Sequence, residues 1–183
     1  SQSVTGKDGT PTALTVTTST QLTANVVGPL ATTLTTTTAQ VTLSSTTGIS
    51  AGYIVTATGT GTLAAGTITV ASVDSGTQVT LSANPIASGA ADLTFTEDLA
   101  QTYSSVATST NSANGNSETV TITRDSSGNV SNAIADQAGF FYAVGETLTV
   151  AGNLVGGATP ADDLVLTIDA VTELAPTQIR EVN

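Results

Sequence analysis

Apolar residues alternate with threonine along most of the chain, which is the pattern of β-strands with one buried and one solvent-facing side. Threonine suits the solvent-facing positions because its branched Cβ favours extended backbone. The alternation is clear at the paired apolar positions Leu14 and Val16, Val41 and Leu43, Ile68 and Val70, Val79 and Leu81, Leu93 and Phe95, Val120 and Ile122, Leu148 and Val150, and Leu164 and Leu166. Turn-forming groups such as Asp74-Ser75-Gly76 and Asp125–Asn129 separate these runs.

This pattern predicts an all-β fold of one or two small antiparallel β-sandwich or barrel modules with extended terminal arms. We expect an N-terminal arm with the first strands over residues 1–39, a first module over 40–98 and a second over 117–172. A connector rich in serine and threonine is expected over 99–116, and a C-terminal tail over 173–183. Only Asn132–Gln137 offers a short helical turn.

The charge balance excludes several classes of partner. Three cations, Lys7, Arg124 and Arg180, stand against fourteen acids in 183 residues, for a net charge of −11. Three dispersed cations cannot make the basic surface that nucleic-acid phosphates require, and anionic membranes would repel the chain. No apolar run approaches the ~20 residues that a membrane-spanning helix needs, so no membrane segment is predicted.

The residue types needed for most catalysis are missing. The chain has no histidine and no cysteine, which removes imidazole bases, thiol nucleophiles and the commonest zinc ligands. The adjacent carboxylates Glu97-Asp98 and Asp162-Asp163 would point to opposite faces of an extended strand and so would not converge. Asp125–Asn129 is the nearest approach to a calcium loop, and a hairpin turn explains it more simply. We expect no catalytic residue, no metal site and no cofactor.

Large aromatic side chains gather at one place, Phe140-Phe141-Tyr142. Consecutive residues of a strand cannot all face one core, so at least one ring should point outward. Core packing is one interpretation of this group. A subunit interface is the other, because buried aromatic residues contribute strongly to binding there.

Two parts of the chain carry a family resemblance. The residues concerned are Val41–Leu43, Thr47–Val55, Ala65–Val73 and Val79–Ser82 in the N-terminal part, and Gly145–Gly152 and Gly156–Leu164 in the C-terminal part. The N-terminal part resembles a β module of structural proteins from tailed bacteriophages. The C-terminal part is similar to a segment of virion proteins from marine phages, cyanophages in particular. The resemblance implies a capsid-decoration, tail or fibre component and carries over no catalytic residue.

The leading hypothesis is therefore a non-enzymatic virion structural protein, a decoration or cement protein on the capsid surface. Its expected partners are other virion proteins, such as the major capsid or tail protein, and copies of itself in a homo-oligomer. Sheet edges and the termini, Ser1–Gly28 and Pro176–Asn183, would pair with neighbours by strand addition. Removing about the first 20 residues should then leave the β-core folded.

Two alternatives remain open at this point. A tail or fibre module that binds host-surface glycan would need a groove with exposed Tyr53, Tyr103 or Tyr142. A subunit of a cellular surface filament or layer would share the threonine-rich composition.

Overall fold

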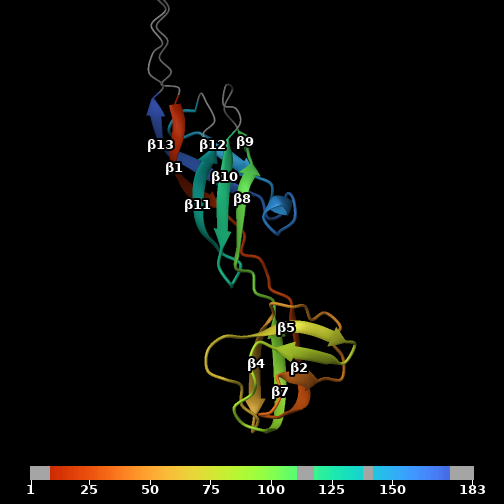
Figure 1. Cartoon of the computed structure of the whole chain (residues 1–183). Coiled ribbons are helices and arrows are strands. Elements are labelled where there is room, and N and C mark those ends of the chain that lie inside the picture. The colour runs from red at the N-terminus through yellow and green to blue at the C-terminus, as the bar shows by residue number, and fades with distance from the viewer. Residues whose placement is uncertain (1–8, 111–117, 138–141, 174–183) are drawn as a thin grey trace, which may run out of the picture. The chain divides into compact units, whose positions relative to one another are not determined.

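The computed structural model describes residues 9–110, 118–137 and 142–173. These form two compact units, and one is interrupted by the other along the chain (Figure 1). The inserted unit is the continuous stretch Thr23–Leu99. The split unit is built from Ser1–Leu22 and Ala100–Asn183, that is, from both ends of the chain.

The inserted unit is a single antiparallel sheet of six strands with the order β2-β7-β4-β5-β6-β3. Its strands are β2 (Val26–Leu34), β3 (Gln40–Thr42), β4 (Ile54–Gly59), β5 (Ile68–Ser75), β6 (Gln78–Leu81) and β7 (Gly89–Thr96). The sheet curls, and the two edge strands β2 and β3 come close to each other. The alternating apolar positions face inward and form one core, in which Leu34, Val79, Leu93 and Phe95 are fully buried.

The split unit is a sandwich of two antiparallel sheets, β1-β13-β12-β9 and β11-β10-β8. Its elements are β1 (Gly9–Thr18), β8 (Gln101–Ala107), β9 (Ser109–Thr110), β10 (Thr119–Arg124), β11 (Val130–Gln137), β12 (Thr147–Val150), the 3₁₀ turn η1 (Gly152–Leu154) and β13 (Leu164–Glu173). Figure 1 shows β1 (red) beside β13 (blue), which come from opposite ends of the chain. Both sheets contribute to one core, with Ile122 and Val120 from one sheet and Leu148 and Leu166 from the other.

The predicted all-β class is confirmed, and the described residues contain no α-helix. The expected helical turn at Asn132–Gln137 is wrong, because these residues belong to β11. In that strand Ala133 and Ala135 lie opposite Ile122 and Val120 of β10, and Ile134 faces solvent. The backbone groups of β11 that face β10 find hydrogen-bond partners there, and this pairing outweighs the intrinsic preference of alanine for a helix.

The structure divides the chain differently from the sequence-based boundaries. Residues 1–39 are not one arm, because β1 pairs with β13 in the split unit and β2 pairs with β7 in the inserted unit. The expected module 40–98 corresponds to the inserted unit without β2, and the expected module 117–172 corresponds to the split unit without β1, β8 and β9.

The expected connector at 99–116 contains β8 and β9. The inward-facing Val106 is buried, and β10 supplies the backbone partners of β8, so few apolar residues suffice to order this stretch. Of the expected terminal arms, residues 1–8 and 174–183 lie outside the described residues.

Removing the first 20 residues would therefore not leave the β-core intact. The deletion takes away the whole of β1, which pairs with β13 from Gly9 to Thr18. Leu14 and Val16 of this strand pack against the core of the split unit. The expectation of a dispensable arm is wrong because nothing in the sequence indicates that the N-terminal strand has its partner about 150 residues away.

Candidate functional site

Tyr142, the described member of the aromatic group, is a core residue of the split unit. Its side chain is 1 % exposed, and its backbone exchanges two hydrogen bonds with Gly9 (2.9 and 3.1 Å). Burial raises the pKa of the Tyr142 phenol, and the negative charge of Glu118 raises it further. Phe140 and Phe141 lie outside the described residues. The interface interpretation therefore does not apply to Tyr142, and for the two phenylalanines it stays a prediction.

Among the carboxylates singled out in the sequence, three accept hydrogen bonds from backbone amides. Asp162 accepts a hydrogen bond from the amide of Ala158 (2.8 Å), and Asp163 accepts one from the amide of Gly152 (2.8 Å). Glu97 accepts one from the amide of Asn25 (3.1 Å). Among the described residues no three His, Cys, Asp or Glu side chains lie close enough together to hold a metal ion. These acids organise loops and strand ends.

Asp125 closes the hairpin turn between β10 and β11, as the turn interpretation predicted. Its carboxylate accepts hydrogen bonds from the amides of Ser127 and Asn129, both at 2.9 Å, and from the Asn129 side chain at 3.1 Å. The hydrogen bonds from Asn129 are the main reason why the pKa of Asp125 lies below its ordinary value. The donors around this carboxylate are amides of the turn itself.

The tyrosines do not form a glycan-stacking surface. Tyr53 is 9 % exposed and Tyr142 is buried, each within its own core. Tyr103 is half-buried, and its hydroxyl lies against the backbone of Gly156. The exposed groove that the glycan hypothesis requires is not built from these three side chains.

Arg124 is a fully buried cation that sequence reasoning did not single out. It is 1 % exposed, and its guanidinium donates to three backbone carbonyls of the split unit: Val155 through Nε (3.0 Å), and Gly128 (2.6 Å) and Thr20 (3.2 Å) through Nη1. Burial lowers the pKa of Arg124, and the nearby Tyr103 and Asp162 partly offset this effect. The alternating pattern of β10 could have revealed that Arg124 is buried, because Val120, Ile122 and Arg124 share the inward face of this strand.

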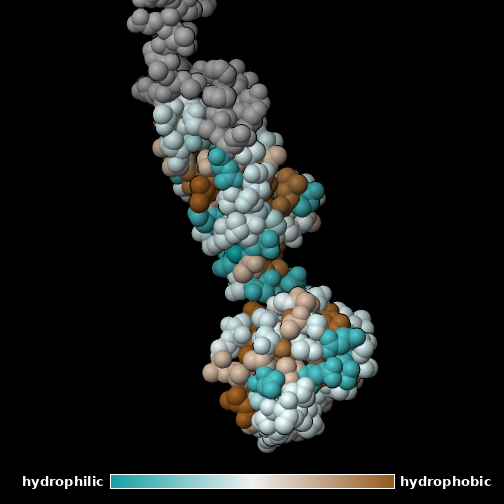
Figure 2. Space-filling view, in the orientation of Figure 1, coloured by the Kyte–Doolittle hydropathy of each residue, from teal (hydrophilic) through white to brown (hydrophobic). Residues whose placement is uncertain are grey.

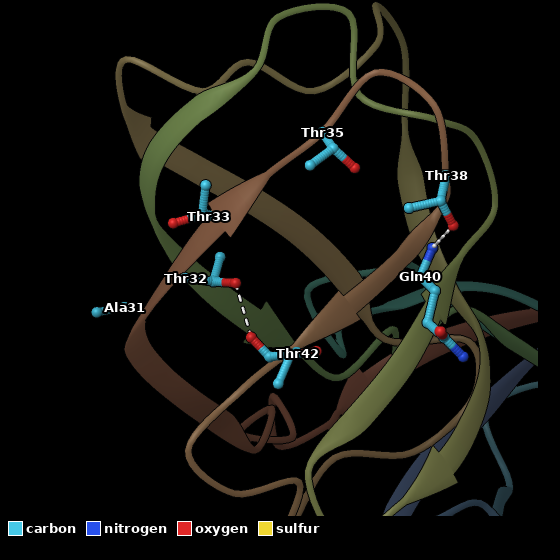
Figure 3. A pocket seen from close by; sticks show the side chains of 7 residues that line it. All are labelled: Ala31, Thr32, Thr33, Thr35, Thr38, Gln40 and Thr42. Carbon is cyan, nitrogen blue, oxygen red and sulfur yellow. Dashed lines mark hydrogen bonds between the residues drawn. The ribbon is translucent and has the colours of Figure 1, made fainter.

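A hollow in the described surface lies at the seam between the two edge strands of the inserted unit (Figure 3). Its volume is about 650 Å³, and it is lined by Ala31, Thr32, Thr33, Thr35, Thr38, Gln40 and Thr42. The lining contains no aromatic and no charged side chain. The threonines can be read from the sequence. Nothing in the sequence indicates that β2 and β3, the two edge strands of one sheet, lie close to each other without pairing.

One hydrogen bond between a side chain and the backbone crosses this seam. Thr32 Oγ1 on β2 donates to the carbonyl of Thr42 on β3 (2.7 Å), and nearby Thr38 Oγ1 accepts from the amide of Gln40 (3.0 Å; Figure 3). Hydroxyl groups thus engage backbone groups that a neighbouring strand would otherwise take. β2 and β3 form no ladder with each other and remain the two edges of the sheet.

The outward-facing backbone groups of β3 follow from its register with β6. Val41 lies opposite Val79, and the amides of Leu81 and Leu43 donate to the carbonyls of Ala39 (2.9 Å) and Thr77 (2.8 Å). Residues 39, 41 and 43 therefore face β6, and the backbone groups of Gln40 and Thr42 face the seam. The hydroxyls of Thr38 and Thr32 engage two of these groups, the Gln40 amide and the Thr42 carbonyl.

The inserted unit is acidic. On the side of β3 away from the seam, Gln40 Nε2 reaches past β6 and donates to the carboxylate of Asp74 on β5 (3.3 Å). Asp92 lines a smaller hollow of about 250 Å³ that shares Ala31 and Thr32 with the seam. Residues 23–99 contain four acids and no lysine or arginine. In Figure 2 much of the visible surface of the inserted unit has intermediate hydropathy, with smaller teal and brown patches.

Comparisons with known proteins find no match to this chain among protein-family models, curated proteins or solved structures. Within the described part of the chain, no helix is long and apolar enough to cross a membrane. The class that the structure defines is thus a small acidic all-β protein of two units.

Proposed function

We propose that this chain is a non-enzymatic structural protein of a tailed-phage virion, located on the particle surface as a capsid decoration or cement protein. The observation that carries the proposal is that β2 and β3, the edge strands of the inserted unit, form no ladder with each other. Sheet edges and threonine hydroxyls suit attachment to another polypeptide. The resemblance of residues 41–82 and 145–164 to phage virion modules supports the same assignment.

The placement of the acids also supports a structural role. Asp125, Asp162 and Asp163 accept hydrogen bonds from loop amides, and the buried cation Arg124 donates to loop carbonyls. Groups used in this way stabilise the fold and are not presented to a substrate. A glycan-binding tail module is the weaker candidate, because no described aromatic side chain is exposed for a sugar to stack on.

The test is to locate the chain on native particles. Particles purified from the source of the sequence are labelled with gold-conjugated antibodies against the chain and viewed by electron microscopy, and their protein content is measured by mass spectrometry. Gold spread over the shell, with many copies per particle, is the expected result. Label confined to the tail tip would contradict decoration and favour the glycan-binding alternative. Purified particles that lack the chain would refute the virion assignment.

A further inference from the structure

We propose that the contact between Asp136 and Ser105 keeps the edge of β8 from pairing with the same edge of a second copy of the chain. The contact thus acts as an autoinhibitory device against self-association of the split unit. The inference concerns the free chain and does not depend on the virion assignment.

β8 has one open edge. It is an edge strand of the sheet β11-β10-β8, and β10 is its only strand neighbour in the described part of the chain (Figure 1). The amide of Thr108 donates to the carbonyl of Glu118 (3.4 Å), so residues 118, 120, 122 and 124 turn their backbone groups toward β8. By the same alternation the backbone groups of Thr102 and Ala107 face outward, where no other described backbone group bonds to them.

The sequence of β8 lacks the usual protection of an exposed edge. Edge strands commonly carry lysine, another charged residue or proline, which discourage pairing with a further strand. β8 reads Gln-Thr-Tyr-Ser-Ser-Val-Ala, and the longer stretch of residues 99–117 contains no charged residue and no proline. Its protection must therefore come from its shape or from elsewhere in the fold.

A β-bulge interrupts this edge. Residues 103 and 106 pair with residues 122 and 120, so two residues of β8, Ser104 and Ser105, stand opposite Thr121 alone. Ser105 has a φ of 56°, and among the residues that the structure describes it is the single non-glycine with positive φ. A bulge bends its strand and increases the local twist. The outward backbone groups on its two sides then no longer form the straight row that a further strand needs.

Asp136 holds this bulge from two strands away. Its Oδ2 atom accepts a hydrogen bond from the amide of Ser105 (2.8 Å) and another from the hydroxyl of Thr121 (2.6 Å). Asp136 itself lies in a bulge of β11, because residues 119 and 120 of β10 pair with residues 137 and 135. One carboxylate thus joins the bulges on both sides of β10, and it engages the amide of a residue in an unfavourable backbone conformation.

Loss of this carboxylate should open β8 to a neighbour. Extended backbone costs serine less than a positive φ, so without the bond from its amide Ser105 is free to leave the bent form. A β8 that can straighten offers its outward backbone groups to the equivalent strand of a second copy. Two identical edges can pair antiparallel about a two-fold axis, the commonest symmetry of protein dimers.

The bulge also has a structural role, which the test must separate from this one. The extra residue lets both Tyr103 and Val106 face the core of the split unit. That role needs the extra residue in β8, but it does not need the carboxylate of Asp136, whose side chain is exposed. Asp136 is therefore the group to change.

Asp136→Ala removes the acceptor and leaves both residues of the bulge in place. Asp169→Ala is the matched control, because Asp169 is an exposed acid of β13 in the other sheet and accepts a hydrogen bond from the hydroxyl of Thr15. Both variants lose one negative charge and one threonine contact. Asp136→Ala combined with Ser105→Gly is the rescue variant, because glycine occupies a bulge position of positive φ without strain.

The experiment is sedimentation velocity of the full-length variants over a range of concentrations, with circular dichroism melting to follow folding. Asp136→Ala should associate about tenfold more tightly than the wild type or Asp169→Ala, and the rescue variant should return toward the wild type. Amide hydrogen exchange locates the contact. In Asp136→Ala the amides of Thr102 and Ala107 should become protected as concentration rises, whereas in the wild type they should stay unprotected.

Four results would overturn the inference. Asp136→Ala could associate no more tightly than Asp169→Ala, or the rescue variant could associate as tightly as Asp136→Ala. The amides of Thr102 and Ala107 could already be protected in the wild type. Asp136→Ala could also lose its cooperative melting, which would make the contact part of the fold and not a device on its surface. The labelling of particles bears on none of these results, so the inference and the virion assignment can fail separately.

Discussion

Replacing Arg124 with methionine should selectively destabilise the split unit. Methionine fills the space of the arginine stem but donates no hydrogen bond. The substitution removes the bonds to the carbonyls of Val155, Gly128 and Thr20, which lie in three different loops of that unit. Of these carbonyls, Gly128 keeps another donor, the amide of Leu22 at 3.2 Å.

The magnitude follows from two opposing terms. Hydrogen bonds from a charged donor contribute about 1.5–3 kcal/mol each, so three of them amount to roughly 4–9 kcal/mol. Burying a charge costs several kcal/mol, and methionine recovers that cost. The difference leaves a loss of about 3 kcal/mol in the free energy of unfolding of the split unit. Arg124→Lys should fall between the two, because a lysine ammonium is a point charge and cannot span three carbonyls as a planar guanidinium does.

Amide hydrogen exchange measures this loss within one molecule. Amides of β10 and β13, such as those of Ile122 and Leu166, should exchange about 100-fold faster in Arg124→Met, since each tenfold corresponds to about 1.4 kcal/mol. Amides of β7, such as those of Leu93 and Phe95, serve as an internal control and should not change. Unchanged exchange in β10 and β13 would show that the three carbonyl bonds add nothing net to stability. Equal acceleration in both units would refute the local character of the effect.

Two further substitutions test local geometry. Gly156→Ala should cost more stability than Gly66→Ala, by about 1–2 kcal/mol in denaturant unfolding, because both glycines have positive φ but only the Cβ at 156 would overlap the Tyr103 hydroxyl. Tyr103→Phe in the Gly156→Ala background should recover part of that difference, and equal costs at the two glycines would contradict the overlap. Asn129→Ala should raise the pKa of Asp125 back toward 3.8 in an NMR titration, because hydrogen bonds from Asn129 lower it. The stabilisation from this carboxylate is thus present above its unfolded-state pKa and is lost as pH falls through its folded-state pKa. If the pKa of Asp125 does not move in the variant, the hydrogen bonds from Asn129 are not what lowers it.

Strand positions could be predicted from the sequence because alternation depends only on local residue order. Leu148 and Val150 in β12, and Leu164, Leu166 and Ile168 in β13, are all fully buried as their spacing indicates. The Asp125–Asn129 turn was predictable for the same reason, since its hydrogen bonds join residues at most four positions apart.

The partners of the strands could not be predicted in this way. β1 and β2 follow each other in the chain and have similar alternating sequences, yet they pair with β13 and β7 in different units. Nothing in either strand encodes its partner, because a strand with one apolar and one threonine-rich face can pair with many similar strands. The insertion of residues 23–99 into the split unit therefore became visible only in three dimensions.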